Sequence, residues 1–362
     1  MNHFHVDEDI RKAETLPASF YRDDEVFERL KEHVFSKSYQ WFGSVDNLLP
    51  QESYVRPLLF IEGYLEEPFF LRKDTRLGLT CFSNVCTHRG NLIFHHEGVS
   101  KRITCGYHGR NWETDGSFKF MPEFKEAENF PRACDHLKPF QTLQLGPQLF
   151  VGIDPGIDLE NVLAKMNERI GFLPLDQFKF DTSQSKDYLV NCHWALYCDN
   201  YLEGFHIPFV HEDLNAALDY GSYTTELFEN GSLQIGYFSG GEEVFVLPVG
   251  HPDHGKEVAA YYYWLFPNMM FNFYPWGLSV NVVRPISKNK TKVLFRSYVW
   301  DESKLSDGAG SVLDKVERED EFVVEGVQKG LQSVTYQSGR FSPKREQGVH
   351  HFHRMLANAL NS

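Results

Sequence analysis

The chain has 362 residues, of which 42% are hydrophobic, and a formal net charge of −14 at pH 7. This length predicts two or three domains with real hydrophobic cores. The negative charge argues against a phosphate-binding surface, so nucleic acid is not an expected partner. The N-terminus shows no basic segment followed by an apolar one, and prolines, glycines and asparagines interrupt the most apolar window, 258–283. We therefore expect no signal peptide, no membrane span and a cytoplasmic location.

The first part of the chain changes from a helical to a β pattern. Apolar residues at helical spacing behind an acidic first turn predict a helix over 23–35. Short β-type runs separated by turn residues follow, and a run at 148–153 looks like the closing strand. The predictions are a helical segment at 1–38 that packs on the catalytic domain, and an all-β domain at 39–155.

The rest of the chain, 156–362, has an α+β pattern. A short amphipathic helix is predicted over 159–170, and a strand near 188–192 precedes a further helical segment. Strands rich in Tyr, Phe, Val and Trp dominate 223–300, and a long helix is predicted over 311–334.

The first chemical motif is Cys-Thr-His-Arg-Gly, followed after a gap by Cys-Gly-Tyr-His-Gly. Its metal-binding side chains are Cys86 and His88 in one loop and Cys105 and His108 in the other. Zinc is the alternative, but zinc sites usually pair Cys with Cys and His with His along the chain. One thiolate and one imidazole per loop suit a Rieske [2Fe–2S] cluster, whose two irons take the two thiolates and the two imidazoles respectively. We predict that these four residues hold such a cluster.

The neighbours of these loops narrow the class of cluster. Respiratory-chain Rieske proteins brace their loops with an extra disulfide, at positions that are Asn91 and Tyr107 here. An unbraced cluster resembles the type found in oxygenases and their ferredoxins. The remaining cysteines are expected to be buried free thiols in a reducing cytoplasm: Cys81, Cys134, Cys192 and Cys198.

A second motif, Asn-Tyr-Leu-Glu-Gly-Phe-His-x4-His, contains Glu203, His206 and His211. Five residues on a straight helix would separate the two histidines by about 140°. Pro208 lies between them and bends the chain, so both imidazoles can converge on one metal. The alternative for the pair is two hydrogen-bonded histidines in an aromatic core.

A third ligand is predicted from the helix at 311–334. At roughly 100° per residue, its apolar residues fall within about 60° of Asp320, whereas Glu319 and Glu321 lie about 100° away. A carboxylate at the centre of a buried stripe must be paired, protonated or bound to metal. A buried ion pair is the alternative. With His206 and His211, Asp320 completes the 2-His-1-carboxylate set of non-haem Fe(II).

On these two motifs the chain resembles the catalytic α-subunit of Rieske non-haem iron oxygenases, the ring-hydroxylating oxygenase family, over essentially its whole length. The resemblance implies an N-terminal Rieske domain and a C-terminal helix-grip catalytic domain with a mononuclear iron. It also implies a head-to-tail homotrimer, in which the cluster of one subunit lies against the iron of the next. A flavin/iron–sulfur reductase would pass electrons from NAD(P)H to the cluster.

Glu203 has a distinct expected role. A carboxylate three residues before His206 can accept the second N–H of its imidazole and make the ligand more basic. In the family the equivalent acid also bridges to a Rieske histidine of the neighbouring subunit, here His108. Most ring-hydroxylating members have Asp at this position, and Glu resembles the branch acting on choline, carnitine and betaines.

We therefore expect a monooxygenase that hydroxylates, or oxidatively N-demethylates, a small quaternary ammonium substrate with O2. An alternative is hydroxylation of an aromatic ring or aromatic acid, for which Arg284 could bind a carboxylate. A Rieske electron carrier without oxygenase activity and a zinc-stabilised binding protein are alternatives of other classes. Aromatic side chains that could line a pocket, without a choice among them, are Tyr220, Phe271, Tyr274 and Trp276.

Overall fold

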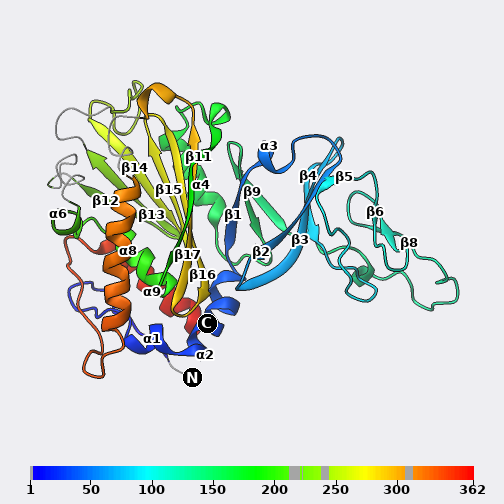
Figure 1. Cartoon of the computed structure of the whole chain (residues 1–362), viewed down its shortest axis with the longest axis horizontal. Helices are drawn as coiled ribbons and strands as arrows, with labels where there is room; N and C mark the ends of the chain where they lie inside the picture. The colour runs from blue at the N-terminus through cyan, green and yellow to red at the C-terminus, as the bar shows by residue number, and fades with distance from the viewer. Residues whose placement is uncertain (1–2, 212–220, 222, 238–243, 306–312) are drawn as a thin grey trace. The chain divides into compact units, whose positions relative to one another are not determined.

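The computed structural model describes residues 3–211, 221, 223–237, 244–305 and 313–362. The chain forms two compact units, drawn in Figure 1. One unit is Tyr39–Pro155, and the other combines Met1–Ser38 with Gly156–Ser362. The first unit is therefore an insertion within the second.

The inserted unit consists of three small antiparallel sheets. One contains β4 (Gly78–Ser83), β3 (Leu65–Asp74), β2 (Tyr54–Ile61) and β5 (Gly98–Val99), in that order. A second contains β1 (Tyr39–Ser44), β10 (Gln148–Gly152) and β9 (Gln141–Leu145), and a third β6 (Ile103–Thr104), β7 (Asn111–Trp112) and β8 (Phe118–Phe120). Its short helices are α3 (Val45–Leu48) and the 3-10 turn Ala133–Asp135.

Both motif cysteines are anchored in the core of this unit. Cys86 and Cys105 belong to one buried apolar cluster that includes Phe70, Phe82 and Trp112. The loop with Cys86 follows β4, and the loop with Cys105 connects β6 to β7. The strands therefore fix both ends of the segments that carry the Cys and His side chains.

The larger unit is built on one seven-stranded antiparallel sheet. Its order is β11 (Lys179–Val190), β17 (Lys290–Val299), β16 (Gly277–Ser287), β15 (Met269–Tyr274), β14 (Val258–Leu265), β13 (Gly231–Tyr237) and β12 (Thr224–Phe228). The strands from β14 to β16 are buried along almost their whole length, which explains the long apolar window in the sequence.

Helices pack against this sheet. The bounds are α1 (Ala18–Arg22), α2 (Asp24–Leu30), α4 (Leu159–Ile170), α5 (Trp194–Tyr201), α6 (Ile207–Val210), α8 (Leu313–Gly330) and α9 (Gln347–Asn361), with a π-helical turn at Lys31–Phe35. Helix α5 contacts β16, α8 and α9. The long α8 runs beside the strands in Figure 1. The predicted α+β class, an all-β domain plus an antiparallel sheet with a long helix, is confirmed.

The sequence prediction for the long helix was wrong in two respects. The helix ends at Gly330, and Val334 beyond it is 88% exposed. Glycine is a poor helix residue and often marks a helix end. Glu317, Val324 and Gln328 are buried residues of this helix, so on the helical wheel its buried face is centred roughly 60° from Asp320, not on it.

Two further sequence predictions concern the cysteines and membrane spans. Cys134 is exposed, not buried as expected, because it lies in the short 3-10 turn at the surface of the inserted unit. Across the described ranges, every helix is too short or too polar to cross a bilayer.

Candidate metal centre and adjoining pocket

The two Cys–His loops have the same backbone geometry. The carbonyl of Cys86 accepts from the Gly90 amide at 3.0 Å, and that of Cys105 accepts from the Gly109 amide at 3.1 Å. The two glycines have φ values of +72° and +73°, a conformation that residues with a side chain rarely adopt. The motif glycines thus close two matching turns.

The loops present donors and ligands suited to a cluster. Burial opposes ionisation of both thiols and leaves the pKa of Cys86 raised, whereas backbone N–H groups two and three residues later point at each sulfur and act in favour of the thiolate. The rings of His88 and His108 lie 4.8 Å apart, centroid to centroid. The buried Nδ1 of His88 has no hydrogen-bond partner within the described ranges. An orphaned imidazole nitrogen beside two thiols fits a metal ligand, so the four residues suit a [2Fe–2S] group.

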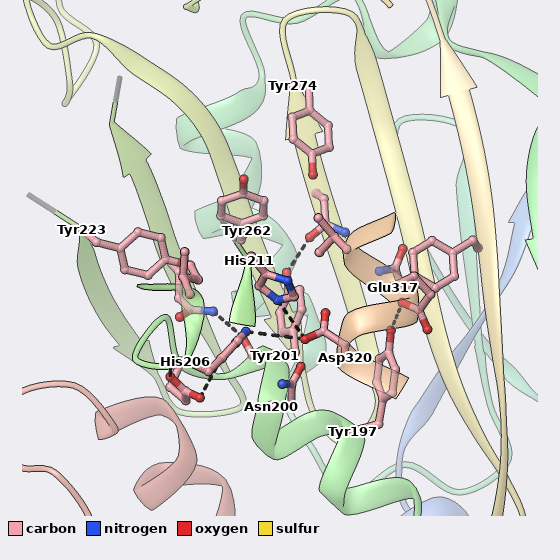
Figure 2. A pocket seen from close by; sticks show the side chains of 17 residues that line it. Tyr197, Asn200, Tyr201, His206, His211, Tyr223, Tyr262, Tyr274, Glu317 and Asp320 are labelled. Carbon is pink, nitrogen blue, oxygen red and sulfur yellow. Dashed lines mark hydrogen bonds and ion pairs between the residues drawn. The ribbon is translucent and has the colours of Figure 1, made fainter. Parts of the chain in front are cut away.

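The structure brings His206, His211 and Asp320 together in the larger unit (Figure 2). One ligand atom from each lies within 4.8 Å of the other two. Oδ1 of Asp320 is 3.0 Å from Nε2 of His211 and 3.6 Å from Nε2 of His206. His206 caps the start of α6 and His211 follows its end, with Pro208 in the first turn. The short helix therefore lets two histidines five residues apart share one face.

The opposite ring nitrogens both face carboxylates. His206 donates from Nδ1 to Oε1 of Glu203 at 2.8 Å, and His211 from Nδ1 to Oε2 of Glu319 at 2.7 Å. A proton held at Nδ1 leaves the lone pair of Nε2 directed at Asp320, the tautomer that a metal ligand requires. Burial alone would lower the pKa of His211, but Asp320 and Glu319 outweigh it and raise that pKa.

Glu319 is a residue that the helical wheel missed. The wheel placed it about 100° from Asp320, which is correct for the backbone. The two residues reach His211 from different sides, because the imidazole offers a nitrogen at each edge. Adjacent acidic residues on a buried helix were the only signal for this pairing.

A cavity of about 120 Å³ adjoins the three candidate ligands. Its 17 lining residues come from α5, α6, α8 and strands β13 to β17, together with Tyr223 and the residues beside α6 (Figure 2). Besides the ligands and Glu203, the wall contains five tyrosines and four amides: Tyr197, Tyr201, Tyr223, Tyr262, Tyr274, Asn200, Gln234, Asn272 and Asn281. No lysine or arginine is among the described residues that line it.

Strand register places the sheet residues on one face. Gln234 lies opposite Tyr262, and Tyr262 lies opposite Asn272 on the next strand. Tyr274 follows Asn272 by two positions and therefore points the same way. Its ring is 6.0 Å from that of Tyr262, in an edge-on arrangement.

The other residues considered from the sequence have different places. Of the aromatic candidates, Tyr274 lines the cavity, Phe271 and Trp276 do not, and Tyr220 lies outside the described residues. Arg284 does not line the cavity. The histidines of α9 form hydrogen bonds to structural partners, as in the 2.9 Å contact of His353 with Asp199.

Comparisons with known proteins match both domains of the chain. The family model for the Rieske [2Fe–2S] domain matches residues 59–131, and that for the ring hydroxylating alpha subunit (catalytic domain) matches residues 178–362. Chloroplastic choline monooxygenase of Arabidopsis thaliana is 29% identical, covering 97% of this chain and 84% of the relative. The carnitine monooxygenase oxygenase subunit of Escherichia coli K12 is 28% identical, covering 97% and 95%.

Solved structures show the same fold. The quaternary ammonium Rieske monooxygenase CntA superposes with a TM-score of 0.76 at 22% identity, covering 99% of both chains. Naphthalene 1,2-dioxygenase from Rhodococcus superposes with a TM-score of 0.70 at 16% identity, covering 96% of this chain and 94% of that one.

Proposed function

The chain belongs to the ring-hydroxylating alpha-subunit family, and we propose that it is the terminal oxygenase of a Rieske monooxygenase acting on a small quaternary ammonium compound. Choline, carnitine and betaines are the candidate substrates, hydroxylated or oxidatively N-demethylated with O2. The relatives named for choline and carnitine support this substrate class. The observation that carries the proposal is a convergent His206–His211–Asp320 set at a pocket lined by tyrosines and without a basic side chain among its described residues.

The site residues have separate parts in this proposal. His206, His211 and Asp320 would hold an iron ion, which supplies O2 activation when bound. Cys86, His88, Cys105 and His108 would hold the cluster that delivers single electrons.

Glu203 and Glu319 are not metal ligands themselves but orient the two histidines that are. Glu203 holds the Nδ1 proton of His206 and thereby keeps Nε2 available to a metal. Its other oxygen accepts from the backbone amides of Phe205 and His206, so its position is fixed by the residues just before α6. We propose that Glu203 also forms the bridge to His108 of a neighbouring subunit in a homotrimer.

The electron source is part of the same proposal. A flavin/iron–sulfur reductase would take electrons from NAD(P)H and pass them singly to the cluster. Glu203→Gln should then retain both metal centres but slow reoxidation of the reduced cluster by O2 in the presence of substrate. Stopped-flow absorbance of the cluster measures that rate, and an unchanged rate would remove Glu203 from the bridge.

Hydroxylation of an aromatic acid is less well supported. An aromatic carboxylate would need a basic partner, and Arg284, the candidate from the sequence, does not line the cavity. A stand-alone electron carrier would have no use for a second site with converging ligands.

One screen tests the proposal. Purified protein with a surrogate reductase is supplied with NADH and O2, and consumption is compared for choline, carnitine, glycine betaine and benzoate. Tight coupling to a hydroxylated or demethylated ammonium product is expected. Coupled turnover of benzoate with none of the ammonium compounds would overturn the substrate class, and two rather than three irons per chain would overturn the oxygenase assignment.

A further inference from the structure

Two residues that line the cavity each have a buried oxygen atom without a hydrogen-bond partner within the described ranges. They are Oε1 of Glu317 and Oε1 of Gln234, on side chains that are 3% and 1% exposed. The second oxygen of Glu317 accepts from the hydroxyl of Tyr197, and the amide nitrogen of Gln234 donates to the Tyr201 carbonyl at 2.7 Å. Each side chain is therefore held in place at one end and keeps one open acceptor at the other.

Open acceptors at such a depth are costly unless something positive or hydrogen-donating meets them. The described lining residues include neither lysine nor arginine. The segments outside the described ranges, 212–220, 222, 238–243 and 306–312, contain no lysine or arginine in their sequence but six acidic residues. Within the described residues, Glu317 therefore has no basic counter-charge at the cavity.

We propose that Glu317 is the counter-charge for the substrate's ammonium group, and that the pocket selects ammonium compounds with a neutral hydroxyl over those with a carboxylate. The inference rests on the proposed function and names the specificity-determining residue. Glu317 lies on α8 one turn before Asp320, and Figure 2 shows the hydrogen bond between its carboxylate and the hydroxyl of Tyr197. A quaternary nitrogen has no proton to donate, so its attraction to Glu317 is purely electrostatic.

The remaining wall suits the same ligand. The rings of Tyr262 and Tyr274 offer faces or edges on the sheet side, and a tyrosine face attracts an ammonium group within about 6 Å. Oε1 of Gln234 can accept from a substrate hydroxyl. A cavity of about 120 Å³ is slightly smaller than the roughly 150 Å³ that takes up benzene, so a trimethylammonium group with a short arm fits its size.

A substrate carboxylate would be disfavoured for the same reason that an ammonium is favoured. It would enter a cavity whose wall carries Glu203 and Glu317 in addition to the iron ligands, with no basic side chain among the described lining residues to receive it. Burial raises the pKa of Glu317; the Tyr197 hydrogen bond opposes this, and Asp320 acts with burial. A permanent cation favours the ionised carboxylate in return.

The test uses two matched substrate pairs. Choline and 3,3-dimethylbutan-1-ol have the same shape but differ in charge, and choline and glycine betaine differ in hydroxyl against carboxylate. Holoenzyme with wild-type sequence should prefer choline in both pairs. Glu317→Gln, which preserves the acceptor for Tyr197, should raise KM for choline roughly 10- to 100-fold and leave the affinity for the neutral alcohol unchanged.

Controls separate the possible failures. Glu325→Gln removes a charge from the same helix at Asn191, away from the cavity, and should change neither substrate. Equal losses for choline and the neutral alcohol would mean that Glu317 is only structural, and a wild-type preference for glycine betaine would overturn the inference without any variant. If the wild-type enzyme oxidises no ammonium compound at all, the proposed function itself is wrong.

Discussion

Replacing Glu319 with Gln should weaken iron binding about tenfold without removing an iron ligand. The carboxylate accepts from Nδ1 of His211 at 2.7 Å, and His211 is 1% exposed while Glu319 is 29% exposed. Losing the carboxylate that orients a metal-bound histidine typically costs 10- to 100-fold in metal affinity. Because Glu319 is partly exposed, we take the lower end, roughly tenfold in Kd, which corresponds to about 1.4 kcal/mol.

The measurement is anaerobic competition for Fe(II) between metal-stripped protein and a chelator of known affinity. It is best made near pH 8, where protons compete less with iron because the pKa of His211 is raised in the metal-free protein. Glu325→Gln removes the same charge from α8 without touching the site and should bind iron like the wild type. An affinity for Glu319→Gln within twofold of the wild type would refute the claim that this carboxylate tunes His211.

Three further predictions follow from other contacts. Asp320→Ala should abolish mononuclear iron and turnover but keep the visible cluster spectrum, whereas Cys105→Ser should bleach the cluster and spare the mononuclear iron; metal analysis and absorbance distinguish the two. Asn91 donates to Sγ of Cys105 at 3.5 Å, so Asn91→Leu should lower the reduction potential of the cluster, on the order of 50 mV, in an EPR-monitored titration; an unchanged potential would contradict it. Asp74 is paired with buried Arg72, which lowers its pKa to about 2 from 3.8, so this carboxylate stabilises the fold above pH 4 and ceases to do so as pH falls through 2. Asp74→Asn should lower the free energy of unfolding by about 2 kcal/mol at pH 7, measured by urea unfolding followed at the cluster absorbance, and an equal stability of the two proteins would contradict this.

The sequence predicted those parts of the candidate sites that lie close together along the chain. The Cys–His loops and the Glu203–His211 segment each span only a few residues, so spacing and glycine or proline positions constrain their shape. Asp320 is distant, but helical periodicity drew attention to it. The fold class followed from the change between β and helical patterns.

The parts that could not be predicted depend on contacts across the fold. Gln234 and Asn272 reach the cavity through the register of neighbouring strands, which periodicity within one strand does not determine. Glu319 pairs with His211 because of the orientation of one imidazole ring. Glu317 is different: it lies about 60° from Asp320 on the same wheel, in line with Val324, so its burial was within reach of the periodicity argument.

The insertion of Tyr39–Pro155 within the larger unit has a consequence for biosynthesis. The amide of Gly156 donates to the carbonyl of Lys37 at 2.9 Å, and β1 pairs with β10, so the inserted segment leaves and rejoins its host at one point. During translation the inserted unit is complete as soon as Pro155 emerges from the ribosome. Thr15 and Ala18, just before and at the start of α1, are made earlier and must wait for Gly339 and Gln337, which are synthesised some 300 residues later. This segment is thus synthesised before the inserted unit but completes its native contacts after it, and during that interval it is exposed to holdase chaperones.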